Sequence, residues 1–564
     1  MKNIKLAIAS EISALLGEVS TPAEIAALFE YPPEKEMGDL ALPCFRFSKA
    51  LRKAPVMIAS GVAESLKSPL INDIKAVNGY LNIYLDDEKV ASQILGDILA
   101  RGDQYGAEDV GKGGAVTMDY SSPNIAKPFH MGHLSSTIIG ESLKRLLTYR
   151  GYKAIGINHL GDWGTQFGKQ IVAYKLWGDD AKIESGGVNE LVAIYVRFHK
   201  EAETNPVLND EAREWFAKLE RGDEEATRLW KWFCEISMRE VERVYKRLKV
   251  SFDYYVGESF YSDRMPAVVE ELRAKNLLKI DQGASIVDLE KYNMPPCLIL
   301  KSNGSTLYPA RDIATALYRH ETFNFVKSLY VTDYAQNLHF AQWFAVIREM
   351  GYDWADDLVH IPFGRVSIEG SAMSTREGNM LPLIEVMDTA VEKVRAIIEQ
   401  KNPGLADKDE VAQNVGIGAV VFNSLSNGRI RDIDFRWDEA LNFDGNTGPY
   451  VQYTYARTCS LIKKAGEQAN TAISGFTSPY ERELVMCLAM FPEKIDAALR
   501  DYEPSIITRY LLDICAAFNR MYNNCPILKS EGAVRDLRVS LTKAANVILG
   551  KGLELICMEK TENI

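Results

Sequence analysis

The pattern of apolar and polar residues between positions 115 and 158 predicts a strand, a helix and a second strand. Residues 115–119 form a short, mostly apolar run that is typical of a buried strand, and the polar residues 121–124 end it. Residues 153–158 predict the second strand, which makes parallel strands with a right-handed crossover the expected arrangement. The helix between them ends at Gly151, and its apolar stripe consists of Ile139, Leu143, Leu146 and Leu147.

The same patterns along the whole chain predict an α/β protein with four parts. The first is an α+β N-terminal domain, and the second is built on a Rossmann-like parallel sheet to which strands at 328–333 and 358–363 also belong. A charged and mostly helical insertion interrupts this second domain at about 180–300. A helical connector and an all-helical C-terminal bundle follow. The predicted boundaries are residues 1–108, 109–380, 381–446 and 447–564.

Two histidines and a glycine stand at the predicted start of the helix. His130, Gly132 and His133 follow the first strand, and ligands of parallel sheets bind at the carboxyl ends of the strands. Unpaired backbone N–H groups favour an anion there, imidazoles can donate to phosphate oxygens, and Gly132 lets a nucleotide approach the backbone. The spacing alone is also compatible with half of a metal site or with surface residues. No cysteine or carboxylate lies within a few residues of the pair, which argues against a metal.

Composition narrows the class of protein. A chain of 564 residues exceeds a single hydrophobic core, and 47% hydrophobic with 25% charged residues is ordinary for a globular protein. Its eight cysteines contain no C-x-x-C pair, which argues against a zinc ribbon and a secreted disulfide framework. Glu11 interrupts the apolar run near the start, and no apolar stretch approaches the roughly 18 residues of a membrane span. We therefore expect a cytoplasmic protein without bound zinc or a membrane partner.

Net charge alone does not indicate a nucleic-acid partner. The formal net charge is −12, but residues 447–564 hold 14 Lys and Arg against 13 Asp and Glu. An RNA-binding protein needs locally positive surface, not a basic whole. Taken singly, most basic residues of this part are also explained by a solvated helical face. The candidates for phosphate contact are Arg457, Lys463, Lys464, Arg500, Arg509, Arg520, Arg535 and Arg538.

Five sequence blocks resemble those of the arginyl-tRNA synthetases, a family of class I aminoacyl-tRNA synthetases. The first contains the H-x-G-H signature. The others resemble the second and third family blocks, the mobile loop of class I enzymes and the entry into anticodon-binding helices. They occur in family order, so the resemblance covers essentially the whole chain. The blocks are residues 119–133, 158–168, 308–314, 373–379 and 443–453.

The resemblance implies an arginine–tRNA ligase, which activates arginine with ATP and transfers it to tRNA(Arg). It implies ATP as a substrate, Mg²⁺ with the nucleotide, a monomer and no DNA partner. The N-terminal domain is then expected to contact tRNA, the second domain to be catalytic and the C-terminal bundle to bind the anticodon. The implied catalytic residues are Lys127, His130, His133, Ser374 and Arg376. The implied ATP contacts are His130, Gly132, His133, Met373 and Ser374.

The implied arginine site has to hold a planar cation with five hydrogen-bond donors, which requires matched carboxylates. The resemblance places these on Asp119 and Asp312, with Tyr308 one helical turn before Asp312. The residues alone leave open that Asp312 only pairs with Arg311 or Arg319 on a surface helix. The remaining implied contacts, partly to the amino and carboxylate ends of arginine, are Ser121, Asn124, His159 and Gln336.

Two positions depart from the family pattern. Ala372 stands where the mobile loop usually has its first lysine, and Ser135 stands where the family usually has arginine. The second lysine of the loop is also absent, and the resemblance implies that Lys127 supplies its charge to the phosphates. These departures leave a second hypothesis open, a non-catalytic paralogue that binds tRNA or arginine. Retention of the histidine pair and of both aspartates argues against it.

Overall fold

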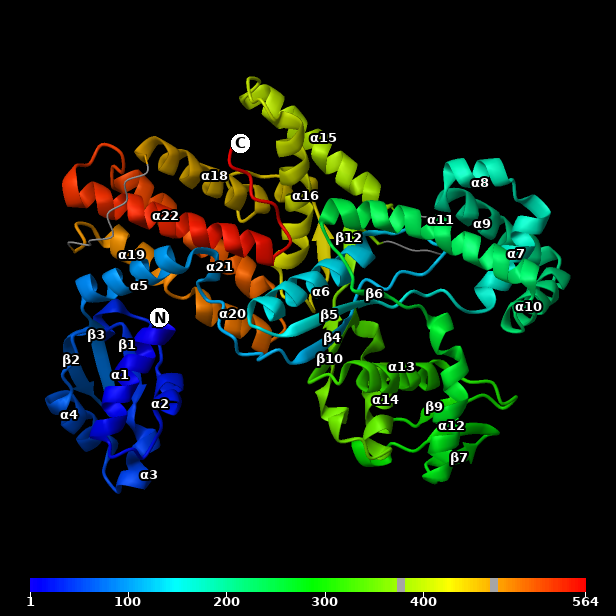
Figure 1. Cartoon of the computed structure of the whole chain (residues 1–564), viewed down its shortest axis with the longest axis horizontal. Helices are drawn as coiled ribbons and strands as arrows, with labels where there is room; N and C mark the ends of the chain where they lie inside the picture. The colour runs from blue at the N-terminus through cyan, green and yellow to red at the C-terminus, as the bar shows by residue number, and fades with distance from the viewer. Residues whose placement is uncertain (373–380, 467–474) are drawn as a thin grey trace.

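The computed structural model describes residues 1–372, 381–466 and 475–564, and a parallel sheet of five strands lies at its centre (Figure 1). The strand order is β11–β10–β4–β5–β6, and every neighbouring pair is parallel. The prediction of an α/β fold class is confirmed. The strands are β4 (Ala115–Asp119), β5 (Lys153–Asn158), β6 (Tyr254–Tyr255), β10 (Lys327–Asp333) and β11 (Leu358–Phe363).

Helix α6 (Met131–Tyr149) joins β4 to β5 and packs against the sheet. Its apolar stripe is the predicted one, and Leu143 and Leu146 are fully buried. Gly151 follows the helix with φ +80°, and a Cβ at this position would clash with Asp109. Only glycine therefore fits the turn that leads into β5.

Helices α13 (Tyr308–Phe323) and α14 (Asn337–Glu349) cover the opposite face of the sheet (Figure 1). Side chains of a strand alternate between the two faces. Leu329 and Val331 of β10 accordingly belong to the apolar core around α6, whereas Tyr330 belongs to the core under α13 and α14. The carboxyl ends of the strands thus open between two layers of helix.

The segment at about 180–300 differs from its prediction in its second half. It is helical up to Leu248, and these helices pack around a separate apolar core that includes Phe198 and Phe233 (Figure 1). An antiparallel sheet with strands of four residues follows, and strands this short show no clear alternation in the sequence. The helices are α8 (Asp180–Gly186), α9 (Val188–Thr204), α10 (Val207–Glu220), α11 (Glu224–Leu248) and, before the antiparallel sheet, α12 (Met265–Ala274). The strands are β7 (Leu278–Asp281), β8 (Ala284–Val287) and β9 (Cys297–Leu300).

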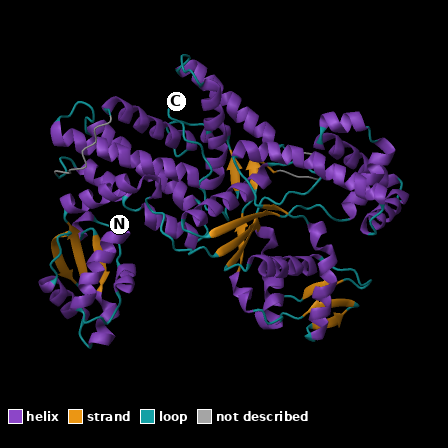
Figure 2. Ribbon diagram, viewed as in Figure 1, coloured by secondary structure: helices purple, strands orange, loops and turns teal. Residues whose placement is uncertain are grey.

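The N-terminal part combines a three-stranded antiparallel sheet with helices, which confirms the α+β prediction for this part of the fold. Figure 2 shows its strands well apart from the central sheet. The sheet order is β1–β3–β2. The elements are α1 (Lys2–Leu15), α2 (Pro22–Leu28), β1 (Leu40–Pro43), α4 (Pro55–Ser65), β2 (Ile71–Val77), β3 (Tyr80–Leu85) and α5 (Asp87–Arg101).

The C-terminal part is a bundle of helices, as predicted, and its described residues include no strand after position 435 (Figure 2). Helices α15 (Leu383–Lys401) and α16 (Lys408–Ser426) precede it. Within the described ranges, no helix is both long and apolar enough to cross a membrane. The bundle consists of α18 (Gly448–Ala465), α19 (Pro479–Leu488), α20 (Phe491–Arg500), α21 (Ser505–Asn524) and α22 (Gly532–Leu555).

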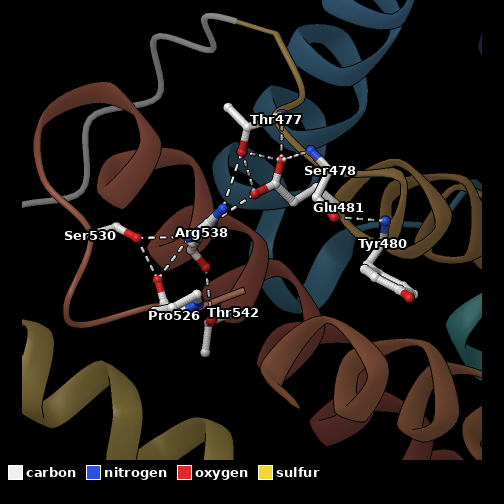
Figure 3. Close-up of polar contacts among 8 residues, drawn as sticks. All are labelled: Thr477, Ser478, Tyr480, Glu481, Pro526, Ser530, Arg538 and Thr542. Carbon is white, nitrogen blue, oxygen red and sulfur yellow. Dashed lines mark hydrogen bonds and ion pairs between the residues drawn. The ribbon is translucent and has the colours of Figure 1, made fainter. Parts of the chain in front are cut away.

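A buried ion pair connects three segments of this bundle (Figure 3). Glu481, in the first turn of α19, is fully buried, and its Oε1 accepts from Arg538 Nε of α22 at 2.7 Å. Its Oε2 accepts from the N–H groups of Thr477 and Ser478 at 2.7 and 3.1 Å. Arg538 Nη1 also donates to the carbonyl of Pro526 at 2.9 Å. The interpretation of Arg538 as a phosphate contact is therefore wrong, because its guanidinium is used inside the bundle.

Candidate active site

The carboxyl ends of the central strands open into a pocket of about 950 Å³. This volume is large enough for an amino acid and a nucleotide together. Met373, Ser374 and Arg376, which belong to the predicted site, lie outside the described residues. The predicted residues that line the pocket are Asp119, Ser121, Asn124, His130, Gly132, His133, His159, Tyr308, Asp312 and Gln336.

The two signature histidines are oriented by backbone contacts at the start of α6. His130 is the N-cap, and its Nδ1 accepts from the Gly132 N–H at 3.1 Å. His133 Nδ1 accepts from the His130 N–H, also at 3.1 Å. An accepting ring nitrogen carries no proton, so these contacts assign the proton of each neutral imidazole to Nε2. A Cβ at Gly132 would lie 2.9 Å from His130 Cε1, which explains glycine at this position.

Burial keeps both imidazoles neutral. Together with the nearby charge of Lys127, it lowers the pKa of His130 to about 4. Burial and the neighbouring His130 and Lys127 lower the pKa of His133 well below its usual value. At neutral pH the pair offers two N–H donors beside the positive end of the α6 dipole. Such fixed donors stabilise negative charge that develops on an anion.

Lys127 lies beside the pocket but does not line it. It borders a small crevice together with Gln166, Phe167 and Tyr195, and burial lowers its pKa. Its charge acts on both signature histidines, which places its ammonium near them. Ser135, the departure next to the signature, is buried within α6.

Each of three carboxylates at the pocket has a cationic or imidazole partner within the protein. A simple surface pair of Asp312 with Arg311 or Arg319 is wrong, because each arginine bonds another carboxylate. The three pairs are Asp119 Oδ2 with Arg319 Nη2 at 2.8 Å, Glu258 Oε2 with Arg311 Nη1 at 2.5 Å, and Asp312 Oδ2 with His339 Nε2 at 2.6 Å.

The loop between β4 and α6 is held by contacts within the protein. Ser121 Oγ forms hydrogen bonds with Thr137 Oγ1 at 2.7 Å and with Tyr245 OH at 2.6 Å. Ser121 has φ +69°, a conformation that such contacts have to maintain. Asn124 lies against Gly161, where a Cβ would clash with the Asn124 side-chain oxygen. The hydroxyl of Ser121 therefore holds the loop in position. Asn124 lines the pocket.

Glu258 and His339 line the same pocket, and no pattern in the sequence indicates either residue. Glu258 follows β6, whose two residues leave no strand pattern to mark this carboxyl end. Burial raises the pKa of Glu258 to about 7, because the opposing charge of Arg311 is itself opposed by Asp312 and Asp162. Glu258 is thus a carboxyl group that titrates near neutral pH.

Three family descriptions match the chain from end to end. Residues 2–85 match the arginyl tRNA synthetase N terminal domain, and residues 94–437 match the catalytic domain of tRNA synthetases class I (R). Residues 451–564 match the DALR anticodon binding domain. The matched catalytic part contains the histidine pair and the pocket carboxylates Asp119, Glu258 and Asp312.

Relatives and solved structures cover the whole chain. It is 51% identical to the arginine–tRNA ligase of Alkaliphilus metalliredigens, over 98% of this chain and 99% of the relative. It is 48% identical to that of Clostridioides difficile, with 100% of both covered. The arginyl-tRNA synthetase of Thermus thermophilus superposes with a TM-score of 0.84 at 27% identity, over 100% of both chains. The arginyl-tRNA synthetase of Plasmodium falciparum superposes with a TM-score of 0.82 at 25% identity, over 100% of this chain and 99% of that chain.

A parallel sheet whose crossover helix begins with the H-x-G-H histidines defines the catalytic domain of class I aminoacyl-tRNA synthetases. The family matches also cover the domain before this catalytic domain and the domain after it. The chain belongs to the arginyl-tRNA synthetase family.

Proposed function

We propose that the chain is an arginine–tRNA ligase, which activates L-arginine with ATP and transfers it to the terminal adenosine of tRNA(Arg). The observation that carries this proposal is a single pocket shared by neutral histidine donors and by carboxylates that include Asp312 and Glu258. The donors suit the phosphates of a nucleotide, and the carboxylates suit a guanidinium. Family membership supports the same reaction.

In the first step the carboxylate of arginine attacks the α-phosphorus of ATP, and pyrophosphate leaves. The protein contributes alignment of the reactants and stabilisation of charge. Nε2–H groups at the start of α6 suit oxygens on which negative charge builds. The residues proposed to contact the nucleotide or its leaving group are Lys127, His130, Gly132, His133, Met373, Ser374 and Arg376.

Arginine is proposed to bind between the end of β4 and the first turns of α13. A guanidinium is always charged, and it gains most from partly buried carboxylates. Asp312 and Glu258 meet this condition, and Tyr308 precedes Asp312 by one turn. The proposed contacts are Asp119, Ser121, Asn124, His159, Glu258, Tyr308, Asp312 and Gln336.

Mg²⁺ is proposed to arrive with the nucleotide. No group of three or more His, Cys, Asp or Glu side chains in the described ranges is arranged to hold a metal ion. Asp119, Glu258 and Asp312 each already have a partner in the protein, so phosphate oxygens and water fit best as ligands. When bound, the ion offsets negative charge on the pyrophosphate.

In the second step a ribose hydroxyl of the terminal adenosine attacks the carbonyl of arginyl-adenylate, and AMP leaves. The match to an anticodon binding domain supports a tRNA contact from residue 451 onward. We also propose a cytoplasmic monomer with no DNA or membrane partner. All eight cysteines are free thiols, which fits a reducing compartment. Sedimentation velocity of the purified chain tests the monomer.

The reaction is tested by arginine-dependent exchange between ATP and pyrophosphate, measured with and without tRNA(Arg). We expect exchange that requires both arginine and tRNA, as the family resemblance implies. Citrulline, a neutral near-isostere of arginine, serves as the control and is expected to support none. Tight tRNA binding without any exchange would favour the non-catalytic paralogue instead.

Asp312→Asn is expected to raise the KM for arginine about 10- to 100-fold, since it removes a charged partner of the guanidinium. The value of kcat is expected to change less, because the guanidinium is at the end of arginine opposite the reacting carboxylate. Steady-state exchange kinetics measure both constants. Asp288→Asn, which changes an exposed carboxylate paired with Lys279, is the control. An unchanged affinity for arginine in isothermal titration would exclude Asp312 from the guanidinium site.

The KM for arginine is expected to fall as pH rises from 6 to 8. Glu258, with a pKa of about 7, is mostly protonated below that pH and ionised above it. A guanidinium binds the ionised form, so KM should fall by up to about tenfold per pH unit below 7. Glu258→Gln should raise KM and flatten this dependence. A wild-type KM that stays constant over this range would contradict the role of Glu258.

Lys127→Ala is expected to lower the rate of arginine activation by at least about 100-fold, the effect of losing one donor to the transition state. Lys127→Arg keeps a cation and is the control that separates charge from packing in the crevice. Single-turnover formation of arginyl-adenylate measures the rate. A rate equal to that of the wild type in Lys127→Ala would remove this residue from the site.

A further inference from the structure

Arg319 is a buried cation that has no role in the proposed reaction. It continues a stripe of α13 formed by Tyr308, Asp312 and Thr315, which all line the pocket. Its side chain is 0% exposed, and its Nη2 donates to Asp119 Oδ2 at 2.8 Å. Burial alone would lower the pKa of Arg319, but Asp119 raises it overall, so the guanidinium stays charged.

This pair leaves Asp119 poorly matched to a second guanidinium. Its Oδ2 accepts from Arg319, and its Oδ1 accepts from Ser122 Oγ at 2.8 Å. A guanidinium binds a carboxylate best through two parallel hydrogen bonds, one to each oxygen. An ammonium is compact and needs only one remaining lone pair. Asp119 therefore suits the α-ammonium of an amino acid better than its guanidinium.

Asp312 and Glu258 are more accessible than Asp119. Each has one oxygen engaged, by His339 and Arg311 respectively, and the described part of the chain provides no hydrogen-bond partner for the other oxygen. Their side chains are 29% and 20% exposed, against 11% for Asp119. The fork of a guanidinium can reach these two carboxylates from the pocket.

We infer that Arg319 is a positioning residue that sets the direction in which arginine binds, an inference that rests on the proposed function. By engaging Asp119 it reserves this carboxylate for the α-ammonium and leaves the guanidinium to Asp312 and Glu258. The reacting carboxylate is bonded to the same carbon as the α-ammonium. It is thereby directed toward the loop that begins at Asp119 and ends at His130. The family resemblance, in contrast, implies that Asp119 binds the guanidinium end of arginine.

Exchange kinetics of Arg319→Met test the inference. Without Arg319, Asp119 can take either cationic end of arginine, so part of the bound substrate points its carboxylate away from ATP. We expect kcat to fall about tenfold or more while the KM for arginine does not rise, the signature of non-productive binding. Arg319→Lys keeps a cation beside Asp119 and should recover most of kcat. A raised KM with unchanged kcat in Arg319→Met would overturn the inference.

A binding measurement keeps the inference testable if Arg319→Met does not fold. Agmatine and butylguanidine differ only in a terminal amino group, so their affinities isolate the ammonium contact. In isothermal titration, the wild type should bind agmatine about 10- to 100-fold more tightly, the effect of one charge-assisted hydrogen bond. Asp119→Asn should remove this preference and leave butylguanidine unchanged. If it weakens both ligands alike, Asp119 contacts the guanidinium and the inference fails. These titrations need no catalysis, so an absence of exchange in the wild type would count against the proposed function alone.

Discussion

His130→Asn is expected to slow arginine activation on the order of 1,000-fold and to leave the start of α6 intact. His130 caps α6 in the structure, and the proposed function gives it a second role. Its Nδ1 accepts from the Gly132 N–H and caps the helix, and its Nε2–H can meet a phosphate oxygen. Asparagine is a good N-cap whose amide oxygen can replace Nδ1, but it has no donor at the position of Nε2.

Single-turnover formation of arginyl-adenylate measures the rate of activation, and thermal unfolding measures the contribution of the N-cap to stability. His130→Ala is the matched control, because it removes donor and cap together. It should lose as much rate as His130→Asn and also about 1 kcal/mol of stability. An asparagine variant as fast as the wild type would show that the Nε2 donor is not used. At saturating arginine the wild-type rate should also not fall between pH 8 and 6 through protonation of His130, since its pKa is about 4.

The local part of this site could be predicted because its signals are local. β4 and β5 have the bounds that the apolar runs indicate, and α6 contains the predicted stripe. A strand buried on both faces leaves a short continuous apolar run, and a helix with one apolar face leaves a period of 3.6 residues. The loop that carries His130 and His133 joins two of these elements, so its position at the carboxyl end of the sheet followed from the strand–helix–strand pattern.

The charge partners in the pocket could not be predicted, because tertiary packing selects them. Arg311 and Arg319 lie within about two turns of Asp312 on the same helix, so spacing alone favours a pair on that helix. The structure instead brings Asp119, 200 residues away in sequence, to Arg319. It also brings His339 from α14 to Asp312. Helical periodicity describes one element at a time and carries no information about these contacts.

Arg538→Met and Glu481→Gln are each expected to destabilise the C-terminal bundle by about 3–5 kcal/mol. Removing one member of the buried pair leaves the other without a charged partner. In Arg538→Met, the partners that Glu481 keeps among the described residues are the N–H groups of Thr477 and Ser478 and the Thr477 hydroxyl (Figure 3). In Glu481→Gln, Arg538 keeps its donors to the loop but loses its counter-charge. Amide hydrogen exchange of α19 and α22 measures the free energy of local opening.

The double variant Arg538→Met with Glu481→Gln separates the buried charge from the packing around it. The double variant leaves no unpaired charge. Its loss of stability should therefore be smaller than the sum of the losses in the two single variants by about 2 kcal/mol or more. Arg520→Met is the matched control in the same bundle, because Arg520 pairs with Glu483 at 2.6 Å with side chains 48% and 34% exposed. Arg520→Met should lose less than about 1 kcal/mol of stability. Equal losses in Arg520→Met and Arg538→Met would mean that burial adds nothing to the pair, and additive losses in the double variant would mean that the two charges do not interact.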